Sequence, residues 1–339
     1  MTAPTVSAVM PCYNGIGYIE RSLPPLLALL ARGEVLEVIV ADDGSTDGSA
    51  EWAAEHGATV LRVGDRDGPG SARNAASAQA RGEIVWFVDA DVVVHEDAIV
   101  PLRGAFEEPD VVAVFGSYDD EPPYEAFASQ YMNLRHHYVH HAHGGEASTF
   151  WSGCGAVRRD AFLAVGGFDA ERYDRPSIED IELGYRLRGA GGRIMMDPAM
   201  QGTHLKEWSL WGVVHTDIVC RALPWSRLLL ETPEAPMALN AGPKEQAKAV
   251  LAGLWLLSGV AALVSSWPWA VFLGLSVVVA AAHGDLFDLF RKRRGWLFAI
   301  AALGFHQFHL LYSGAAFVWA WVRYQLEGRP RAGSGGHAR

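Results

Sequence analysis

Short apolar runs alternate with helix-like segments in the first part of the chain. The predicted strands are residues 6–10, 36–40, 59–63 and 84–88, and the predicted helices are residues 22–31, 49–56 and 72–80. Strands that alternate with helices indicate a parallel sheet with right-handed crossovers. The pattern therefore predicts an α/β, Rossmann-like domain with a mostly parallel sheet.

The last third of the chain contains two long runs without Asp, Glu, Lys or Arg. Residues 249–282 are 34 such positions, and one helix of that length would extend about 50 Å, well beyond the ~30 Å hydrocarbon core of a membrane. The expected break is Trp267-Pro268-Trp269, because proline stops a helix and tryptophan prefers the headgroup level. Residues 249–283 are therefore predicted to form two short spans or a re-entrant hairpin, and residues 296–322 one further span.

These patterns divide the chain into three parts. Residues 1–240 would form the α/β domain, with interfacial helices over about 200–240; residues 241–325 would form a transmembrane region, and residues 326–339 a polar tail. The N-terminus lacks the features of a signal peptide, and the positive-inside rule assigns the basic run at 291–294 to the cytoplasm. We therefore expect a multi-pass protein of the inner (cytoplasmic) membrane, with its first domain facing the cytoplasm.

Charge and cysteine content exclude several classes of protein. The net charge is −11, but residues 241–339 hold ten Lys or Arg and four Asp or Glu, which leaves eighteen basic and thirty-five acidic residues in 1–240. The acidic first part argues against a nucleic acid partner, whereas the basic last third suits anionic lipids. Cys12, Cys154 and Cys220 are too distant from one another to indicate a disulfide framework or a zinc site.

Polar residues follow three of the predicted strands, at Pro11–Asn14, Asp42-Asp43 and Asp89-Ala90-Asp91. Ligands of parallel sheets bind beyond the carboxyl ends of the strands, so we expect these groups at one rim. Crowded carboxylates need a cation among them, and hard oxygen ligands select Mg²⁺ or Mn²⁺. Because magnesium usually binds through one or two carboxylates plus substrate phosphates, the rim predicts a phosphate-bearing substrate.

Seven sequence blocks, in order, resemble those of family 2 glycosyltransferases with the GT-A fold. They cover roughly residues 5–230 and read PCYNG (11–15), ADDGSTDGS (41–49), GSARNAA (70–76), VWFVDADVVV (85–94), SGCGAVRRDAF (152–162), GGFD (166–169) and SIEDIELGYRL (177–187). The resemblance implies transfer of a sugar from a nucleotide diphosphate donor, with uridine as the default base and with inversion at the anomeric carbon.

The resemblance also implies roles for individual residues. The residues assigned to the nucleotide sugar are Pro11, Tyr13, Asn14, Asp42, Asp43, Gly70, Arg73, Asn74 and Asp89. Asp91, together with Asp89, would hold the metal, and Asp180 would be the general base with Glu179 beside it. Gly153 and Cys154 fall on the acceptor or diphosphate side. An inverting transfer needs a base across the sugar from the metal, but acids at 179–180 also suit a helix N-terminus.

Residues further along the chain leave alternatives open. His204 would complete the metal or diphosphate site, or would be a buried structural histidine, and Lys206 could neutralise phosphate. Residues 221–225 are similar to the Arg/Gln-x-x-Arg-Trp signature of lipid-linked and processive members. They depart from it at Pro224, which replaces the second Arg. Arg221 would lie on the diphosphate side, and Trp225 would flank the acceptor or anchor the chain at the membrane interface.

Five histidines crowd the segment from His136 to His143. Their i,i+4 spacing makes a metal site conceivable. We favour instead a helix near the membrane surface, with imidazoles that meet lipid phosphates.

The patterns together predict a membrane-anchored, cytoplasm-facing glycosyltransferase with a lipid acceptor. Apolar segments begin soon after Trp225, so they would hold the cleft against the bilayer, where a lipid headgroup can enter. A polyprenyl phosphate and a hydroxyl-bearing lipid compete as acceptors, and a growing polysaccharide is the third alternative. The alternatives from other classes are a sugar nucleotidyltransferase, which generally opens with a Gly-rich phosphate loop, and a non-catalytic membrane scaffold.

Overall fold

The computed structural model describes residues 4–232 and 242–327 of the 339-residue chain, in two compact units. The first unit runs to Leu210 and also includes Asp288–Phe298, and the second comprises Trp211–Phe287 and continues from Ala299. The first unit therefore ends earlier than the predicted boundary near residue 240. Most of the predicted polar tail, from residue 328 onward, lies outside the described residues.

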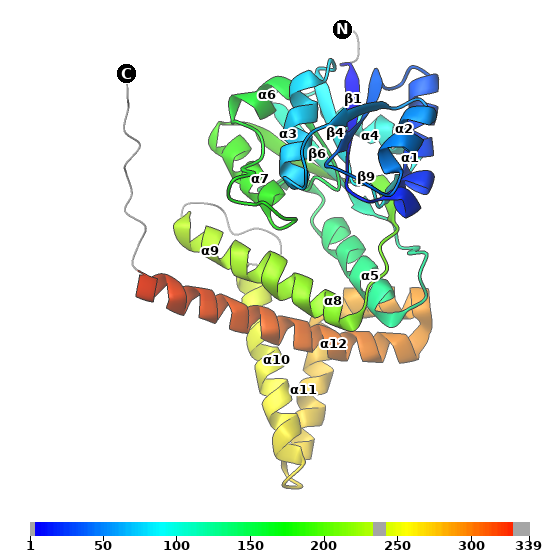
Figure 1. The fold of residues 1–339 in the computed structure, drawn as a ribbon. Coiled ribbons are helices and arrows are strands. Elements are labelled where there is room, and N and C mark those ends of the chain that lie inside the picture. Colours follow the sequence, from blue (N-terminus) through cyan, green and yellow to red (C-terminus); the bar gives the residue numbers. More distant parts are fainter. Residues whose placement is uncertain (1–3, 233–241, 328–339) are drawn as a thin grey trace. The chain divides into compact units, whose positions relative to one another are not determined.

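A nine-stranded sheet forms the centre of the first unit (Figure 1). The strand order is β3-β2-β1-β4-β8-β6-β9-β5, and β7 pairs with β9. The predicted strands correspond to the first four, which confirms the βαβ pattern at the start of the chain. The strands are β1 (Val6–Cys12), β2 (Glu37–Asp42), β3 (Thr59–Arg62), β4 (Ile84–Val88), β5 (Val92–Val94), β6 (Val111–Tyr118), β7 (Gly145–Ala147), β8 (Cys154–Arg158) and β9 (Arg193–His204).

The sheet is mixed, so the prediction of a mostly parallel sheet was wrong for its second half. Strands β3, β2, β1 and β4 pair in parallel, as predicted, and β6 pairs in parallel with β9. Strand β8, however, inserts between β4 and β6 antiparallel to both, and β5 and β7 pair antiparallel with β9. An apolar run identifies a buried strand but carries no information on its direction.

Helices cover both faces of the sheet. One face carries α1, α2 and α4, which bury their apolar residues with the inward side chains of β1 and β4. The other face carries α3, α6 and α7, where Phe87 of β4 packs against Phe162 and Phe168. The helices of this unit are α1 (Ile16–Ala31), α2 (Ser49–Glu55), α3 (Pro69–Gln79), the 3₁₀ turn η1 (Glu96–Ala98), α4 (Ile99–Ala105), α5 (Phe127–Ala142), α6 (Arg159–Ala164) and α7 (Glu179–Gly189).

Helix α1 begins at Ile16, earlier than the predicted start at residue 22, and continues through two prolines. A proline inside a helix removes a hydrogen bond and crowds the carbonyl of the preceding turn. Burial of four large residues on the face toward the sheet offsets this cost, because each of them is fully enclosed. They are Ile19, Leu23, Leu26 and Leu29.

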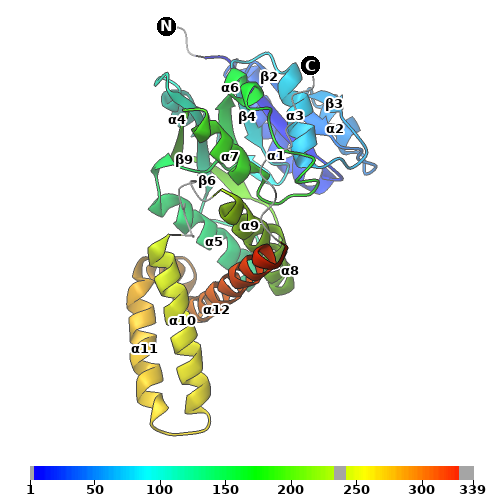
Figure 2. The ribbon, with the colours of Figure 1, turned by 90° about the vertical axis from the view of Figure 1, so that its left-hand side faces the viewer.

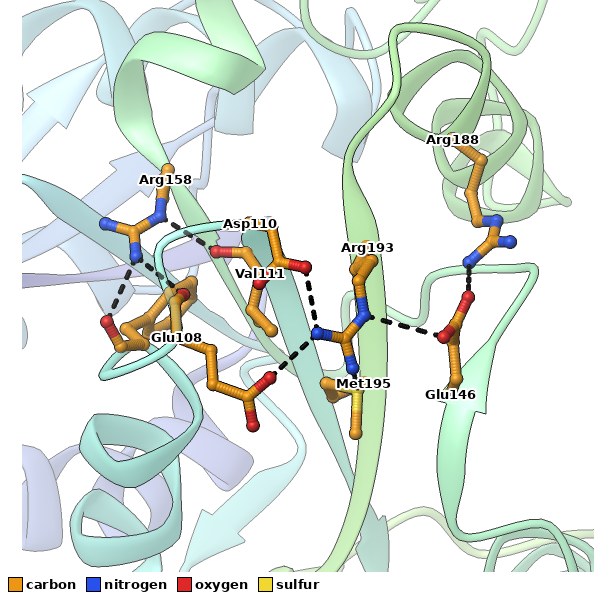
Figure 3. Close-up of polar contacts among 9 residues, drawn as sticks. Glu108, Asp110, Val111, Glu146, Arg158, Arg188, Arg193 and Met195 are labelled. Atoms are coloured by element: carbon orange, nitrogen blue, oxygen red, sulfur yellow. Dashed lines mark hydrogen bonds and ion pairs between the residues drawn. The ribbon is translucent and has the colours of Figure 1, made fainter.

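Ion pairs join the loops at the edge of the sheet where β6 and β9 begin (Figure 3). The guanidinium of Arg193 contacts Glu108 at 2.7 Å, Asp110 at 2.9 Å and Glu146 at 3.5 Å. Arg158 donates to backbone carbonyls of the loop before β6, including that of Val111 at 2.8 Å. These groups lie at the amino ends of the strands, so the carboxyl ends remain free for a site.

The described residues of the second unit are mainly helical. The π-helical turn η2 separates α8 from α9, and α10 and α11 form an antiparallel hairpin (Figure 2). Helix α12 is broken at Gly295, whose φ of 81° is not helical, and its residues Asp288–Phe298 belong to the first unit. The elements are α8 (Leu210–His215), η2 (Thr216–Ala222), α9 (Leu223–Glu231), α10 (Pro243–Ala262), α11 (Pro268–Ala282) and α12 (Gly284–Glu327).

Among the described residues, no single helix has both the length and the apolar character that a membrane crossing requires. The pair α11 and α12 meets both requirements only together, and it is bent by 82°. This finding does not support the prediction that residues 296–322 cross a membrane alone.

We expect Gly116→Ala to lower the free energy of unfolding by about 2–3 kcal/mol. Gly116 lies in β6 at an irregularity of its pairing with β9, and a Cβ there would come within 1.7 Å of the Met200 carbonyl oxygen. Backbone rather than a flexible side chain would have to move. Urea denaturation followed by circular dichroism measures the change, with Gly17→Ala in α1 as the control, because nothing lies within 4 Å of that position. Equal stabilities of the two variants would contradict the expected clash.

Candidate active site

The loops after β1 and β2 interlock at the carboxyl edge of the sheet. Asn14 donates its backbone N–H to Ser45 Oγ at 2.9 Å, and its Oδ1 accepts the backbone N–H of Thr46 at 2.8 Å. The φ of Asn14 is 46°, a left-handed conformation that asparagine adopts more readily than most residues. The ring of Tyr13 is exposed beside these loops, with the Arg66 guanidinium 5.1 Å from its centroid. Tyr13 thus offers a flat aromatic surface at the rim.

The two aspartates after β2 organise the backbone of the rim. Asp43 is buried, and its two oxygens accept the backbone N–H groups of Asp67 at 2.9 Å and Gly68 at 2.8 Å. Asp42 is fully buried, and its Oδ1 accepts the backbone N–H of Ser45 at 3.2 Å. Asp43 therefore supports the loop that leads into α3, and Asp42 supports the loop between β2 and α2. Asp42 presents no surface to a ligand in this structure, so its predicted nucleotide contact finds no support in the geometry.

Arg73 joins two parts of the predicted site. This residue of α3 is 3% exposed, and its Nη2 donates to Asp89 Oδ1, directly after β4, at 2.5 Å. Its Nη1 lies 3.6 Å from Glu179 Oε1 at the start of α7. The guanidinium also lies over the ring of Phe168, with 5.4 Å between its carbon and the ring centroid. Three sequence blocks far apart in the chain therefore meet at one buried cation.

Asn74 and Gly70 position the loop that contains Phe168. Asn74 Nδ2 donates to the Phe168 carbonyl and Asn74 Oδ1 accepts the Phe168 N–H, both at 2.8 Å. A Cβ on Gly70 would lie 3.4 Å from the Phe168 side chain, so helix and loop approach closely. These predicted diphosphate-side residues hold the wall of the site, and the amide of Asn74 is already engaged by backbone groups.

Asp180 has the properties of a general base. Its Oδ2 accepts the backbone N–H of Ser152 at 3.2 Å. The carbonyl of the following residue, Gly153, accepts the backbone N–H of Asp89 at 3.1 Å, so the same loop contacts both aspartates. Burial raises the pKa of Asp180 to about 7, and the neighbouring carboxylate of Glu179 contributes to the rise. A carboxylate that titrates near neutrality can accept a proton and release it again under physiological conditions.

Asp91 and His204 form the second polar pair of the site. Strand β5 pairs with the end of β9, and His204 Nε2 lies 3.4 Å from Asp91 Oδ2. His204 Nδ1 lies 2.8 Å from Asn133 Oδ1, and the imidazole stacks on Tyr118 with 4.3 Å between centroids. Burial alone would raise the pKa of Asp91, but the imidazole and the ammonium of Lys206 hold it below its usual value.

Sequence analysis missed Asn133. It lies in α5, 71 positions from His204 along the chain, and its side chain is buried. An asparagine within a helix gives no signal of such a contact. The amide oxygen of Asn133 can accept a hydrogen bond only from a protonated Nδ1 of His204. This contact fixes the orientation of the imidazole, so that Nε2 of His204 faces Asp91.

The histidine cluster lies on α5 and packs against the end of β6. His136 stacks on Tyr118, and His140 meets the edge of Trp151 with 5.0 Å between ring centroids. His137 Nδ1 lies 2.9 Å from the Tyr118 carbonyl oxygen. The interpretation of this cluster as a lipid-phosphate surface was wrong for these three residues, because they pack against the sheet. No group of three or more His, Cys, Asp or Glu that could hold a metal occurs in the described part of the chain.

Pro11 and Cys154 are enclosed within strands. Pro11 is buried in β1, and Cys154 is fully buried at the start of β8, opposite Val88. Burial raises the pKa of the Cys154 thiol to about 12, so it is neither a nucleophile nor an exposed contact. A Cβ on Gly153 would lie within 2.4 Å of the Trp151 ring, so this position is restricted to glycine. For Cys154, the predicted contact with acceptor or diphosphate was wrong.

Arg221 and Trp225 belong to the second unit. Arg221 Nη1 lies 3.6 Å from Asp217 Oδ1 within that unit. Lys206, in the first unit, holds its ammonium 4.3 Å from the centroid of the Trp208 ring. The roles of Arg221, Trp225 and Lys206 toward diphosphate or acceptor stay predictions.

Known proteins resemble the first unit in sequence. Residues 7–166 match the family model "Glycosyl transferase family 2". Glycosyltransferase GlyG of Streptococcus pneumoniae serotype 4 is 31% identical over 118 residues, which are 33% of this chain and 38% of that protein. The pre-mycofactocin glycosyltransferase of Mycobacterium tuberculosis is 30% identical over 218 residues, 60% of this chain and 44% of that protein. The chain thus spans less than half the length of these curated relatives.

Solved structures resemble the fold. The mannosyltransferase PcManGT of Pyrobaculum calidifontis, in complex with GDP-Man and Mn²⁺, superimposes with a TM-score of 0.60 at 24% identity, covering 94% of this chain and 88% of that chain. GalNAc-T7, with UDP, GalNAc and Mn²⁺, gives a TM-score of 0.52 at 17% identity, covering 68% and 48%. The match over residues 7–166 and the mixed sheet together support a similarity of the first unit to glycosyltransferase family 2 with the GT-A fold.

Proposed function

We propose that this protein transfers a sugar from a nucleotide diphosphate donor to an acceptor, with inversion at the anomeric carbon. The main support is the contact of Arg73 with both Asp89 and Glu179, because it joins the acidic rim to the helix that carries Asp180. Asp180 is then suited to accept the proton of an attacking hydroxyl, since its pKa is raised to about 7. Glu179 contributes to that rise and faces the guanidinium.

Asp91 and His204 would hold a Mg²⁺ or Mn²⁺ ion together with oxygens of the donor diphosphate, since such an ion usually takes one or two protein ligands plus substrate phosphates. The pair fits this role, because Asn133 directs His204 Nε2 toward Asp91 Oδ2, 3.4 Å away. Asp89, the third predicted ligand, is paired with Arg73. A proton between His204 Nε2 and Asp91 Oδ2 can be replaced by a cation, since metal binding displaces ligand protons. Such an ion offsets the charge that builds on a departing diphosphate. The Mn²⁺ present with PcManGT and GalNAc-T7 supports a divalent ion.

The donor in this proposal is a UDP-sugar, and Tyr13 and Asn14 lie where a nucleotide would meet the rim of β1. PcManGT was crystallised with GDP-Man and GalNAc-T7 with UDP. Assays should therefore compare both nucleotides.

The acceptor in this proposal is a lipid at the cytoplasmic face of the inner membrane. The support is the exposed apolar surface of α10 and α11, which includes Leu257, Leu263 and Val264. A polyprenyl phosphate and a hydroxyl-bearing lipid are the two acceptor types. A growing polysaccharide is the alternative acceptor.

The direct test incubates the purified chain with Mn²⁺, a membrane lipid extract and a panel of radiolabelled UDP- and GDP-sugars. We expect release of the nucleoside diphosphate and a labelled lipid, which mass analysis identifies. Release of pyrophosphate would indicate a nucleotidyltransferase instead. Absence of both products with every donor would contradict the proposed activity and favour a membrane scaffold.

Asp180→Asn should lower kcat at least a thousandfold while nucleotide-sugar affinity changes less than about threefold, because only proton transfer is lost. Calorimetric titration measures the affinity. The matched control is Asp110→Asn, which makes the same chemical change in the Arg193 cluster at the other edge of the sheet. Retention of transfer in Asp180→Asn would remove the assignment of the base.

The raised pKa of Asp180 predicts two pH dependences. The value of kcat/KM should rise from pH 5.5 to 8 with a midpoint near pH 7, because only the carboxylate accepts a proton.

The same raised pKa affects the stability of the fold. The folded state binds the proton of Asp180 more tightly than the unfolded state, so the contribution of this residue to the free energy of unfolding is lost as pH rises from about 4 to about 7. Asp180→Asn should therefore be more stable than the parent at pH 8, by on the order of 2 kcal/mol, and equal to it at pH 4. Identical denaturation midpoints at pH 8 would show that the pKa is not raised.

Asp91→Asn should weaken Mn²⁺ binding at least tenfold, because it removes the anionic ligand of the proposed pair. Electron paramagnetic resonance of free Mn²⁺ measures the affinity without any enzymatic turnover. Asp97→Asn, an exposed carboxylate in η1, is the control and should bind as the parent does. Activity that is indifferent to chelators, together with unchanged Mn²⁺ affinity in Asp91→Asn, would contradict the metal site.

A further inference from the structure

Helices α10 and α11 expose many apolar side chains. Val250, Leu254, Leu257 and Val260 of α10 are each more than half exposed, and α11 has no charged residue. A helix that is apolar on every face normally lies inside a protein or a membrane. The two arms pack against each other (Figure 2), and α10 also approaches α12, since a Cβ on Gly253 would lie 3.9 Å from Leu311. The exposed apolar side chains of α10 and α11 lie outside these contacts and would need another cover.

Polar side chains within the two arms beyond the first turns of α10 are hydrogen-bonded inside the hairpin. Trp255 Nε1 donates to Ser276 Oγ at 2.9 Å across the two arms, and Ser276 Oγ in turn lies 2.8 Å from the Phe272 carbonyl. Charged residues occur only in the first turns of α10, where Lys248 pairs with Glu245 at 2.7 Å. An interior free of unpaired polar groups is what a hydrocarbon environment requires.

The tip of the hairpin is the part most exposed and least charged. Leu263, Val264 and Trp267 are 79%, 86% and 72% exposed, and the turn between the helices contains no charged residue. Ser265 and Ser266 are the polar residues of this turn, and both are exposed. A tip that crossed to water on the far side of a bilayer would be expected to carry charged residues as well. The lack of charge and the three large exposed apolar side chains therefore favour hydrocarbon over water.

The arms are too short for two crossings. Helix α11 has 15 residues, and the uncharged part of α10, from residue 249 to 262, has 14. At about 1.5 Å per residue each arm extends about 22 Å, less than the ~30 Å hydrocarbon core. The arms can enter a bilayer deeply, but they return before they reach the opposite surface.

We propose that α10 and α11 form a re-entrant hairpin that inserts into one face of a lipid bilayer and leaves both of its ends on that face. This proposal rests on the membrane part of the proposed function, and for residues 249–283 it selects the re-entrant hairpin over the two short spans that the sequence left open. Helix α12, which is bent by 82° from α11, then lies along the same surface. It carries an exposed apolar stripe with helical spacing, at Ile300, Phe308, Trp319, Val322 and Leu326.

Depth-dependent labelling tests the proposal on the full chain. Ser265→Cys at the tip and Gln246→Cys at the base, each combined with Cys220→Ser, are labelled with the fluorophore NBD and mixed with vesicles of 30% phosphatidylglycerol in phosphatidylcholine. We expect the tip probe to be quenched at least threefold more by lipids with a nitroxide deep in the acyl chain than by lipids with a shallow one. It should also resist dithionite on either side of the vesicle. The base probe should be reduced fully by external dithionite.

Three results would overturn the proposal. Reduction of the tip probe by dithionite trapped inside the vesicle would show that the hairpin crosses the bilayer. A tip probe that stays in water with vesicles would show that it does not insert. A tip probe shielded without lipid, in a chain that elutes as a dimer, would identify a second copy as the cover.

A charge at the tip provides a second test. Val264→Asp should lower the apparent affinity for these vesicles at least tenfold in flotation, whereas Gln246→Asp at the base should not change it. Val264 is 86% exposed, so the substitution leaves the fold intact. Unchanged flotation of Val264→Asp would contradict insertion. The Asp180→Asn variant should insert as the parent does, so insertion and sugar transfer can fail independently.

Discussion

The buried guanidinium of Arg73 is the interaction on which the candidate site depends. It is almost fully enclosed and is paired with Asp89 and Glu179, so removal of either carboxylate would leave a buried cation less well compensated. Its position is set by α3, which begins where Asp43 fixes the backbone of Gly68. A cation held in this way joins the sheet edge to α7 and so determines where Asp180 lies. The acid–base chemistry therefore rests on an electrostatic contact rather than on apolar packing.

Several polar residues of the rim hold backbone rather than ligand. The side chains of Asn14, Asp43 and Asn74 each bind peptide groups of a neighbouring loop. Loops fixed in this way do not need to reorganise when a charged ligand arrives, which is the condition for strong electrostatic stabilisation in a site. The resemblance to glycosyltransferases assigned these residues to the donor directly. In the structure they fix the backbone of the rim, and the ring of Tyr13 is exposed beside them.

Local patterns in the sequence predicted β1 to β4 and the helices between them. Each of these elements buries apolar residues whose spacing along the chain is characteristic of a strand or of a helix. The patterns did not predict the antiparallel β8, since direction and pairing depend on residues far apart in the chain. The same limit applies to sites. Asp89 and Asp91 stand directly after an apolar run, so they could be placed at the rim, whereas the link from Asn133 to His204 crosses 71 positions and follows only from the packing of α5.

The two units place apolar residues in opposite ways, and this difference indicates two solvents. In the first unit the large apolar side chains of β4 and α1 are enclosed, as the hydrophobic effect in water requires. In the second, residues of the same type cover the outside of α10 and α11, while the polar contact of Trp255 with Ser276 is turned inward. Water would penalise this arrangement in proportion to its exposed apolar area, and hydrocarbon would favour it. This contrast between the two units is the physical reason for proposing that the chain works where the two solvents meet.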